Sequence, residues 1–174
     1  GSSIGNFTPE EALLFLAQVH AVCAAEPGSG LLIGVDLVKS KQVLEAAYDD
    51  ALGVTAAFNR NLLLHFNKLA GTNFKLEDWQ HIGLYNTAQH RIEMHLEALR
   101  NTVVQWPEGQ RVFKQGERMH TENSYKWTLP SFEQLLLQAG FEHTTAYTDE
   151  QGWFALFYAQ VRNPAMMSSR SAVK

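Results

Sequence analysis

The first forty residues pair a helical pattern with an unbroken apolar run. Thr8 is a candidate N-cap, Pro9 suits the first helical turn, and Glu11 stands at the capping-box position. Apolar residues then recur over 13–19 at helical spacing. The run at 30–37, GLLIGVDL, lacks strict alternation, which is typical of a strand buried on both faces of a parallel sheet. A helix that leads into such a strand predicts part of a doubly wound α/β fold.

The pattern changes further along the chain. Residues 41–70 predict a helix that breaks near Gly53, and 75–82 predict a short helix or turn. The segments YNTAQH, RIEMHLEAL, NTVVQW and QRVFKQ then alternate between apolar and polar positions, which predicts a small antiparallel sheet. A helix follows, from Thr128 to a stop at Gly140. The end of the chain predicts a hairpin, HTTAYT and WFALFYAQV, around the turn DEQG.

This order predicts an α+β insertion within a larger α/β domain. We expect residues 1–41 and 127–163 to belong to the larger domain, 42–126 to form the insertion, and 164–174 to be a loose tail. The strand at 30–37 needs neighbouring strands, and GSSIGN resembles a loop that follows another strand. The chain therefore reads as the second half of an α/β domain. An unpaired edge beside this strand predicts self-association.

Composition narrows the range of partners. The chain has 174 residues, of which 45% are hydrophobic and 18% are charged, with a net charge of −4, so nucleic acid and anionic membranes are unexpected partners and a small molecule is the default. No apolar stretch is long enough to span a membrane. The single cysteine, Cys23, excludes an internal disulfide and fits a cytoplasmic location. The seven histidines show no HxxxH spacing, so no metal site is expected.

Polar residues in two segments are candidates for binding a ligand. Glu122 and Ser124 in TENSYKW have one residue between them, which on a strand places both side chains on one face. A carboxylate and a hydroxyl there could bond a polar ligand, although a solvated strand face explains the same spacing. Tyr48 offers a neutral donor or a half-buried aromatic ring. Asp49 and Asp50 read first as capping or solvated charges.

Five segments in order carry a family resemblance over residues 1–162: GSSIGNFTPEEA, LLIGVDLVK, AAYDDALGVTAAFNRNLL, RIEMHL and TENSYKW. Together they resemble the S-adenosylmethionine-dependent histidine Nα-methyltransferases of the ergothioneine pathway. The resemblance implies the C-terminal half of a Rossmann-like class I methyltransferase sheet with an inserted α+β substrate-binding domain. It also implies S-adenosylmethionine as cofactor and histidine as substrate. In the family the main cofactor loop precedes the GSSIGN-like segment, so we expect this chain alone to be inactive.

The resemblance assigns roles to the polar candidates. It implies that Asn6 and Tyr48 hold the carboxylate of the substrate, while Glu122 and Ser124 hold its imidazole. For Asn6 the alternative is a helix or loop cap. An amino-acid-binding or self-associating fragment without catalysis remains an alternative, as does a methyltransferase for another amine.

The resemblance also assigns the walls of the site. It implies that Met94 packs against the imidazole, that Thr55 and Phe58 line the cavity, and that Gly1 and Ser2 approach the cofactor or the reacting amine. Core packing explains Met94 and Phe58 equally well. Asp36 and Lys39, which follow the apolar run, read as structural residues.

Overall fold

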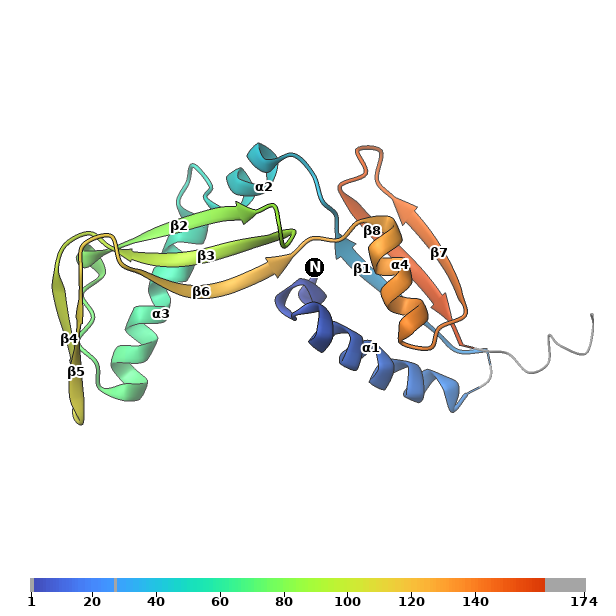
Figure 1. Ribbon diagram of the computed structural model, residues 1–174, viewed down its shortest axis with the longest axis horizontal. Coiled ribbons are helices and arrows are strands. Elements are labelled where there is room, and N and C mark those ends of the chain that lie inside the picture. Colours follow the sequence, from blue (N-terminus) through green and yellow to red (C-terminus); the bar gives the residue numbers. More distant parts are fainter. Residues whose placement is uncertain (1, 27, 162–174) are drawn as a thin grey trace, which may run out of the picture. The chain divides into compact units, whose positions relative to one another are not determined.

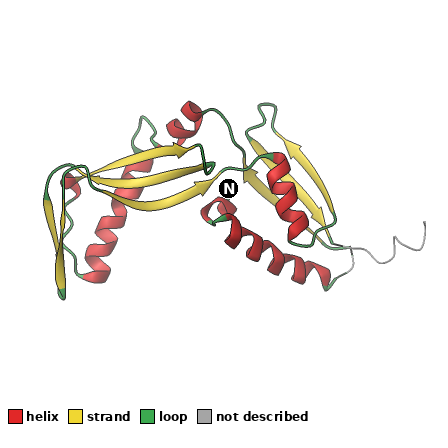
Figure 2. Ribbon diagram, viewed as in Figure 1, coloured by secondary structure: helices red, strands yellow, loops and turns green. Residues whose placement is uncertain are grey.

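The chain forms two compact units in the computed structural model, which describes residues 2–26 and 28–161 (Figures 1 and 2). Unit 1 combines the described residues of 1–38 and 125–174, and unit 2 is formed by 39–124. The fold is mixed α/β with antiparallel sheets. Among the described residues, no helix combines the length and apolar character needed to cross a bilayer. The tail expected at 164–174 lies outside the described residues.

Unit 1 is a three-stranded sheet with two helices. Its elements are η1 (Ser3–Asn6), α1 (Pro9–Ala24), β1 (Gly30–Asp36), α4 (Leu129–Gln138), β7 (His143–Thr148) and β8 (Phe154–Gln160). The predicted helix start is confirmed, because Glu11 N–H donates to Thr8 Oγ1 while Thr8 N–H donates to the Glu11 carboxylate, which completes a capping box. The predicted helix from Thr128 is confirmed as α4.

The expectation that residues 30–37 form a parallel strand buried on both faces is wrong. β1 pairs antiparallel with β8, and β8 pairs antiparallel with β7, in the order β1-β8-β7. Only Val35 of β1 is fully buried, and Leu32 is 65% exposed. The physical reason is that both helices of unit 1 pack on the same face of the sheet. The continuous apolar run of β1 therefore belongs to a strand that is covered on one face only.

The core of unit 1 lies between that sheet face and the two helices. It joins alternate residues of β1 and β8 to the inner faces of α1 and α4, including Val35, Ala155, Phe157, Leu16 and Phe132. The predicted C-terminal hairpin is confirmed. Asp149 closes its turn by accepting hydrogen bonds from the backbone N–H groups of Trp153 and Phe154.

Unit 2 packs two helices against a second antiparallel sheet. Its elements are α2 (Lys41–Tyr48), α3 (Val54–Ala70), η2 (Leu76–Asp78), β2 (Trp79–Asn86), β3 (Arg91–Ala98), β4 (Thr102–Trp106), β5 (Gly109–Phe113) and β6 (Arg118–Tyr125). The strands form a sheet in the order β2-β3-β6 and a separate hairpin β4-β5. The predicted helix break near Gly53 is confirmed. The short helix or turn predicted for 75–82 is wrong beyond residue 78, where β2 begins.

Alternation along β3 separates the two faces of the unit 2 sheet. Ile92, Met94, Leu96 and Ala98 are buried, and they belong to the two apolar cores that also contain Leu44 of α2 and Leu63 of α3. The residues between them, Glu93, His95 and Glu97, therefore point to the face that α2 and α3 do not cover. Along β3, the two faces of the sheet thus differ in polarity.

Candidate functional site

A hydrogen bond joins two residues that the sequence analysis nominated. Tyr48 Oη lies 2.7 Å from Ser124 Oγ, which connects the end of α2 to the end of β6. Ser124 is buried and Tyr48 is half-buried. The resemblance assigned these hydroxyls to opposite ends of a substrate, whereas in this structure they bond each other.

Three residues that the sequence analysis missed fix the position of Tyr48. His81 Nε2 lies 2.7 Å from the carbonyl oxygen of Tyr48, and His81 Nδ1 lies 2.9 Å from the side-chain amide nitrogen of Asn59. The amide N–H of Asn59 donates to Nδ1, and the Nε2–H donates to the carbonyl oxygen of Tyr48. A Cβ at Gly83 would lie 3.0 Å from that same carbonyl oxygen.

Asn59 is the central residue of this support. It is buried in α3, and its amide nitrogen also donates to the carbonyl oxygen of His95 at 3.1 Å. One side chain thereby ties α3 to both β2 and β3. The sequence gives little indication of this role beyond an asparagine inside a predicted helix, because the partners of Asn59 lie 22 and 36 residues further along the chain.

Glu122 and Phe58 line one hollow of about 230 Å³ between α3 and β6. Thr121 is a further wall, held by a bond from its hydroxyl to the carbonyl oxygen of Met94 at 2.9 Å. Phe58 is 67% exposed, so the interpretation of Phe58 as ordinary core packing is wrong. Glu122 is partly buried. A carboxylate and an aromatic ring thus meet at an accessible concave surface.

Met94 and Thr55 have different surroundings. Met94 is buried in a cluster with Leu44, Tyr85 and Ile92, against which Tyr48 packs. Thr55 lies in the first turn of α3, where its N–H donates to Asp50 Oδ1 at 2.8 Å. These contacts make Met94 a core residue beside Tyr48.

The capping role expected of Asp50 is confirmed. Its carboxylate accepts from the N–H groups of Val54 and Thr55 at the start of α3. These hydrogen bonds, led by the one from the Thr55 backbone, lower the pKa of Asp50 to about 2. Asp50 therefore supports the helix that carries Phe58 and Asn59.

The candidates in unit 1 lie before α1. Asn6 is exposed at the end of η1, and Thr8, not Asn6, caps α1. Ser2 Oγ accepts a hydrogen bond from the Asp36 N–H at 3.0 Å, which ties it to the end of β1. Gly1, the other cofactor candidate, lies outside the described residues.

A buried ion pair lies at the same strand end. Lys126 Nζ is 2.9 Å from Asp36 Oδ2, and the lysine side chain is 1% exposed. The backbones beside it are also joined, since Trp127 N–H donates to the Asp36 carbonyl and Val38 N–H donates to the Trp127 carbonyl. The structural interpretation of Asp36 is therefore confirmed, while the lysine within TENSYKW was missed.

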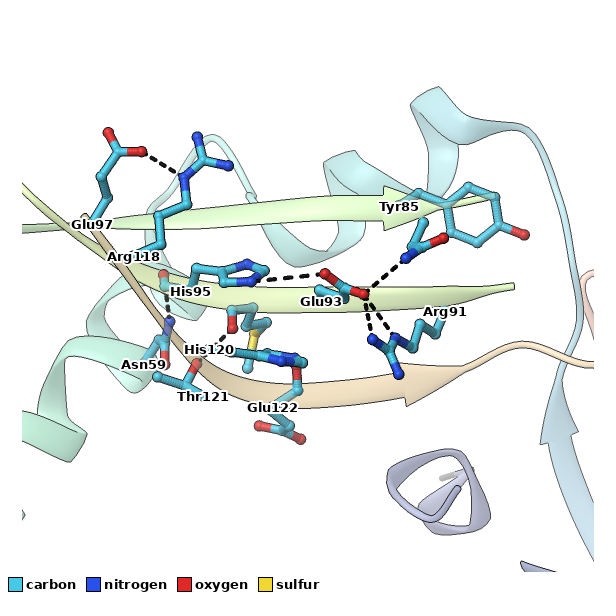
Figure 3. Close-up of polar contacts among 12 residues, drawn as sticks. Asn59, Tyr85, Arg91, Glu93, His95, Glu97, Arg118, His120, Thr121 and Glu122 are labelled. Atoms are coloured by element: carbon cyan, nitrogen blue, oxygen red, sulfur yellow. Dashed lines mark hydrogen bonds and ion pairs between the residues drawn. The ribbon is translucent and has the colours of Figure 1, made fainter. Parts of the chain in front are cut away.

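A second polar cluster lies on the face of the unit 2 sheet that bears Glu93 and His95 (Figure 3). Burial would raise the pKa of Glu93, but hydrogen bonds from Asn86 and Arg91 outweigh it and hold the pKa below its usual value. Burial lowers the pKa of His95, and the nearby His120 on β6 lowers it further. The His95 and His120 rings stack with centroids 4.7 Å apart.

Comparison with known proteins places the chain in a family. A family model described as "Histidine-specific methyltransferase, SAM-dependent" matches residues 1–161. The chain belongs to this family of S-adenosylmethionine-dependent methyltransferases.

Individual relatives carry matching names. A histidine N-alpha-methyltransferase of Mycolicibacterium smegmatis is 40% identical over 161 residues, which is 91% of this chain and 50% of that protein. One of Mycobacterium tuberculosis is 40% identical over 170 residues with the same coverage. The "Ergothioneine biosynthesis protein 1" of Neurospora crassa is 31% identical over 151 residues, 85% of this chain and 17% of that protein. The chain thus spans about half the length of the first two relatives.

Proposed function

We propose that the protein takes part in methyl transfer from S-adenosylmethionine to the α-amine of histidine, and that unit 2 recognises the imidazole. The observation that carries this proposal is the bond between Tyr48 and Ser124 at the end of β6, with Glu122 two residues earlier on the same strand. Support comes from the names of relatives that are 40% identical over most of the chain. Unit 2 is proposed to be the inserted substrate-binding domain, and unit 1 part of a Rossmann-like sheet.

The side chains of Glu122 and Ser124 suit an imidazole ligand. The Glu122 carboxylate can accept from one ring nitrogen, and the Ser124 hydroxyl can bond the other. Because Tyr48 and Ser124 bond each other at 2.7 Å, a substrate that uses both hydroxyls has to replace that bond with two of its own. An apolar ring would offer no N–H group to the Glu122 carboxylate, and a desolvated site penalises an unpaired carboxylate strongly.

The neighbouring residues complete the proposed site. Phe58 shares the hollow with Glu122, and Met94 backs Tyr48 from the core. Thr55 stays a proposed wall residue, and Asn6 a proposed ligand of the substrate carboxylate. Orientation is the main task of these side chains, because displacement at a methyl group requires the attacking amine to lie in line with the leaving sulfur.

Ser2 fits a role beside the cofactor. Its hydroxyl accepts from the Asp36 N–H and keeps its own proton, which can be donated to a carboxylate. Gly1 is proposed for the same region. When bound, S-adenosylmethionine supplies an electrophilic methyl group on its sulfonium sulfur. The chain's own contribution is to hold Ser2 at the end of β1 through Asp36, which Lys126 neutralises.

The recognition of histidine can be tested by calorimetry on the 174-residue chain. Histidine should bind, and phenylalanine should bind at least about 100-fold more weakly, because the aromatic ring lacks nitrogens for Glu122 and Ser124. Equal binding of the two amino acids would leave the proposal without support. In a methyltransferase assay we expect no turnover by this chain alone, and observed turnover would refute that part.

Self-association is a second candidate property, favoured by the edge strand β1. Leu32 of β1 and Leu156 of β8 are exposed on the sheet face opposite the unit 1 core, and β1 ends the sheet order. An apolar edge strand can pair with another copy of the chain. Analytical ultracentrifugation would show dimers, whereas a clean monomer at high concentration would contradict this.

Cys23 is a free cysteine, which favours the proposed cytoplasmic location.

A further inference from the structure

Three side chains of metal-ligand type converge on the sheet face of unit 2 that α2 and α3 do not cover. Glu93 and His95 project from β3, and His120 projects from the neighbouring β6 (Figure 3). One ligand atom from each lies within 4.8 Å of the other two. We propose that these three residues bind a divalent transition-metal ion of the Zn²⁺ class. Two imidazoles and one carboxylate suit such ions better than Mg²⁺ or Ca²⁺.

The separations are close to those of a formed site. Zinc bonds to imidazole nitrogen and carboxylate oxygen are about 2.0–2.2 Å long, so two ligands of one ion lie roughly 3.4 Å apart in a tetrahedral arrangement. Glu93 Oε2 and His95 Nε2 are already 3.7 Å apart. His120 is exposed, so its ring can turn to close the remaining distance. A water molecule can complete the four ligands.

The hydrogen bonding of His95 differs from that of a structural histidine. Both ring nitrogens of His81 have partners within hydrogen-bond distance, Asn59 and the Tyr48 carbonyl. In contrast, His95 Nδ1 is buried without a partner among the described residues, and Nε2 faces Glu93 at a distance too long for a hydrogen bond. Nε2 is therefore the nitrogen that can bind an ion, with the ring proton on Nδ1.

The surroundings hold the carboxylate in place. Glu93 Oε1 accepts from Arg91 Nη2 at 2.6 Å and from Asn86 Nδ2 at 3.0 Å, which leaves Oε2 directed at His95. Such outer contacts are typical of metal-ligating carboxylates. Two cations lie nearby, but each is paired with a carboxylate, Arg91 with Glu93 and Arg118 with Glu97. These four side chains together carry no net charge.

An ion here would join β3 to β6. His120 is two residues from Glu122, and its Nε2 bonds the Glu122 carbonyl oxygen at 3.1 Å. The ion would therefore hold the strand that carries both Glu122 and Ser124. This inference stands on the cluster itself and does not depend on the proposed methyltransferase function.

Calorimetric titration of ZnCl₂ into the metal-stripped 174-residue chain tests the site. We expect one ion per chain, with His95→Ala and His120→Ala each weakening binding at least tenfold. His143→Ala, which removes an exposed histidine of β7, is the matched control and should leave binding unchanged. MgCl₂ should not bind at comparable concentrations. Absence of zinc binding, or zinc binding by both cluster variants as tight as that of the unsubstituted chain, would overturn the proposal.

A thermal-shift measurement distinguishes the loss of zinc binding from the loss of folding in a variant. His120 is exposed, so His120→Ala should keep the circular dichroism spectrum of the unsubstituted chain. Zinc should raise the unfolding midpoint of the unsubstituted chain and of His143→Ala, because an ion that binds the folded state stabilises it. It should not raise that of His120→Ala. An equal rise in a well-folded His120→Ala variant would also overturn the site.

Discussion

Lys126 Nζ lies 2.9 Å from Asp36 Oδ2, and this buried contact joins the end of β1 to the first residues after β6 within unit 1. The two residues are 90 positions apart in the chain. The pair fixes the strand end to which Ser2 is also bonded. The ion pair therefore helps to hold Ser2, which precedes α1, in position.

Replacing Lys126 should destabilise the protein strongly. Lys126→Met removes the ammonium group that bonds the partly buried Asp36 carboxylate, and a hydrogen bond between charged groups contributes about 1.5–3 kcal/mol. Urea unfolding followed by tryptophan fluorescence measures the loss. Lys41→Met is the matched control, because Lys41 is largely exposed and pairs with Glu45 at 3.7 Å, a contact worth under about 1 kcal/mol. Similar losses in both variants would contradict a structural role for the buried pair.

The Tyr48–Ser124 bond should contribute to the stability of unit 2. Tyr48→Phe removes the hydroxyl that bonds the buried Ser124 oxygen, and the loss of this hydrogen bond costs about 1–2 kcal/mol of unfolding free energy. Tyr147→Phe, at a 60% exposed position, should change stability little. In a double-mutant cycle, the combined loss of Tyr48→Phe and Ser124→Ala should be smaller than the sum of the single losses. Strict additivity would mean that the two hydroxyls do not interact.

Asp50 should give the protein an acid-dependent stability. The unfolded carboxyl has a pKa near 3.8, and the folded one has a pKa of about 2. The unfolded state therefore binds the proton more readily, so the contribution of Asp50 is complete above pH 4 and is lost as the pH falls toward 2. Thermal unfolding of Asp50→Asn between pH 5 and pH 2 should show a shallower decline than that of Asp49→Asn, which keeps the Asp50 cap. Parallel curves for the two variants would argue against this role.

The parts of the fold that the sequence predicted depend on local interactions. Thr8 and Glu11 cap α1 within a single turn, and the break between α2 and α3 follows from Gly53, whose φ is 69°. Asp50 likewise acts on residues four and five positions away. Such contacts involve neighbours in the chain, so residue type and spacing suffice to predict them.

The missed features depend on partners far along the chain. The environment of β1 is set by β8, about 120 residues later, so its apolar run could not reveal that only one face is covered. The supports of Tyr48 come from Asn59 and His81 on different elements. The cluster of Glu93, His95 and His120 forms only when β6 lies beside β3, so a search for helical histidine spacing could not detect it.

The most direct test of the proposed recognition is a titration of histidine against the Glu122→Gln variant of the 174-residue chain. The substitution keeps the shape of the side chain but removes the charge that should bind an imidazole N–H. We predict at least about tenfold weaker histidine binding, since a hydrogen bond to a charged group contributes about 1.5–3 kcal/mol. Glu108→Gln, at an exposed position between β4 and β5, is the matched control and should bind histidine normally. Equal histidine affinity in the Glu122→Gln and unsubstituted chains would contradict the assignment of Glu122 to the imidazole.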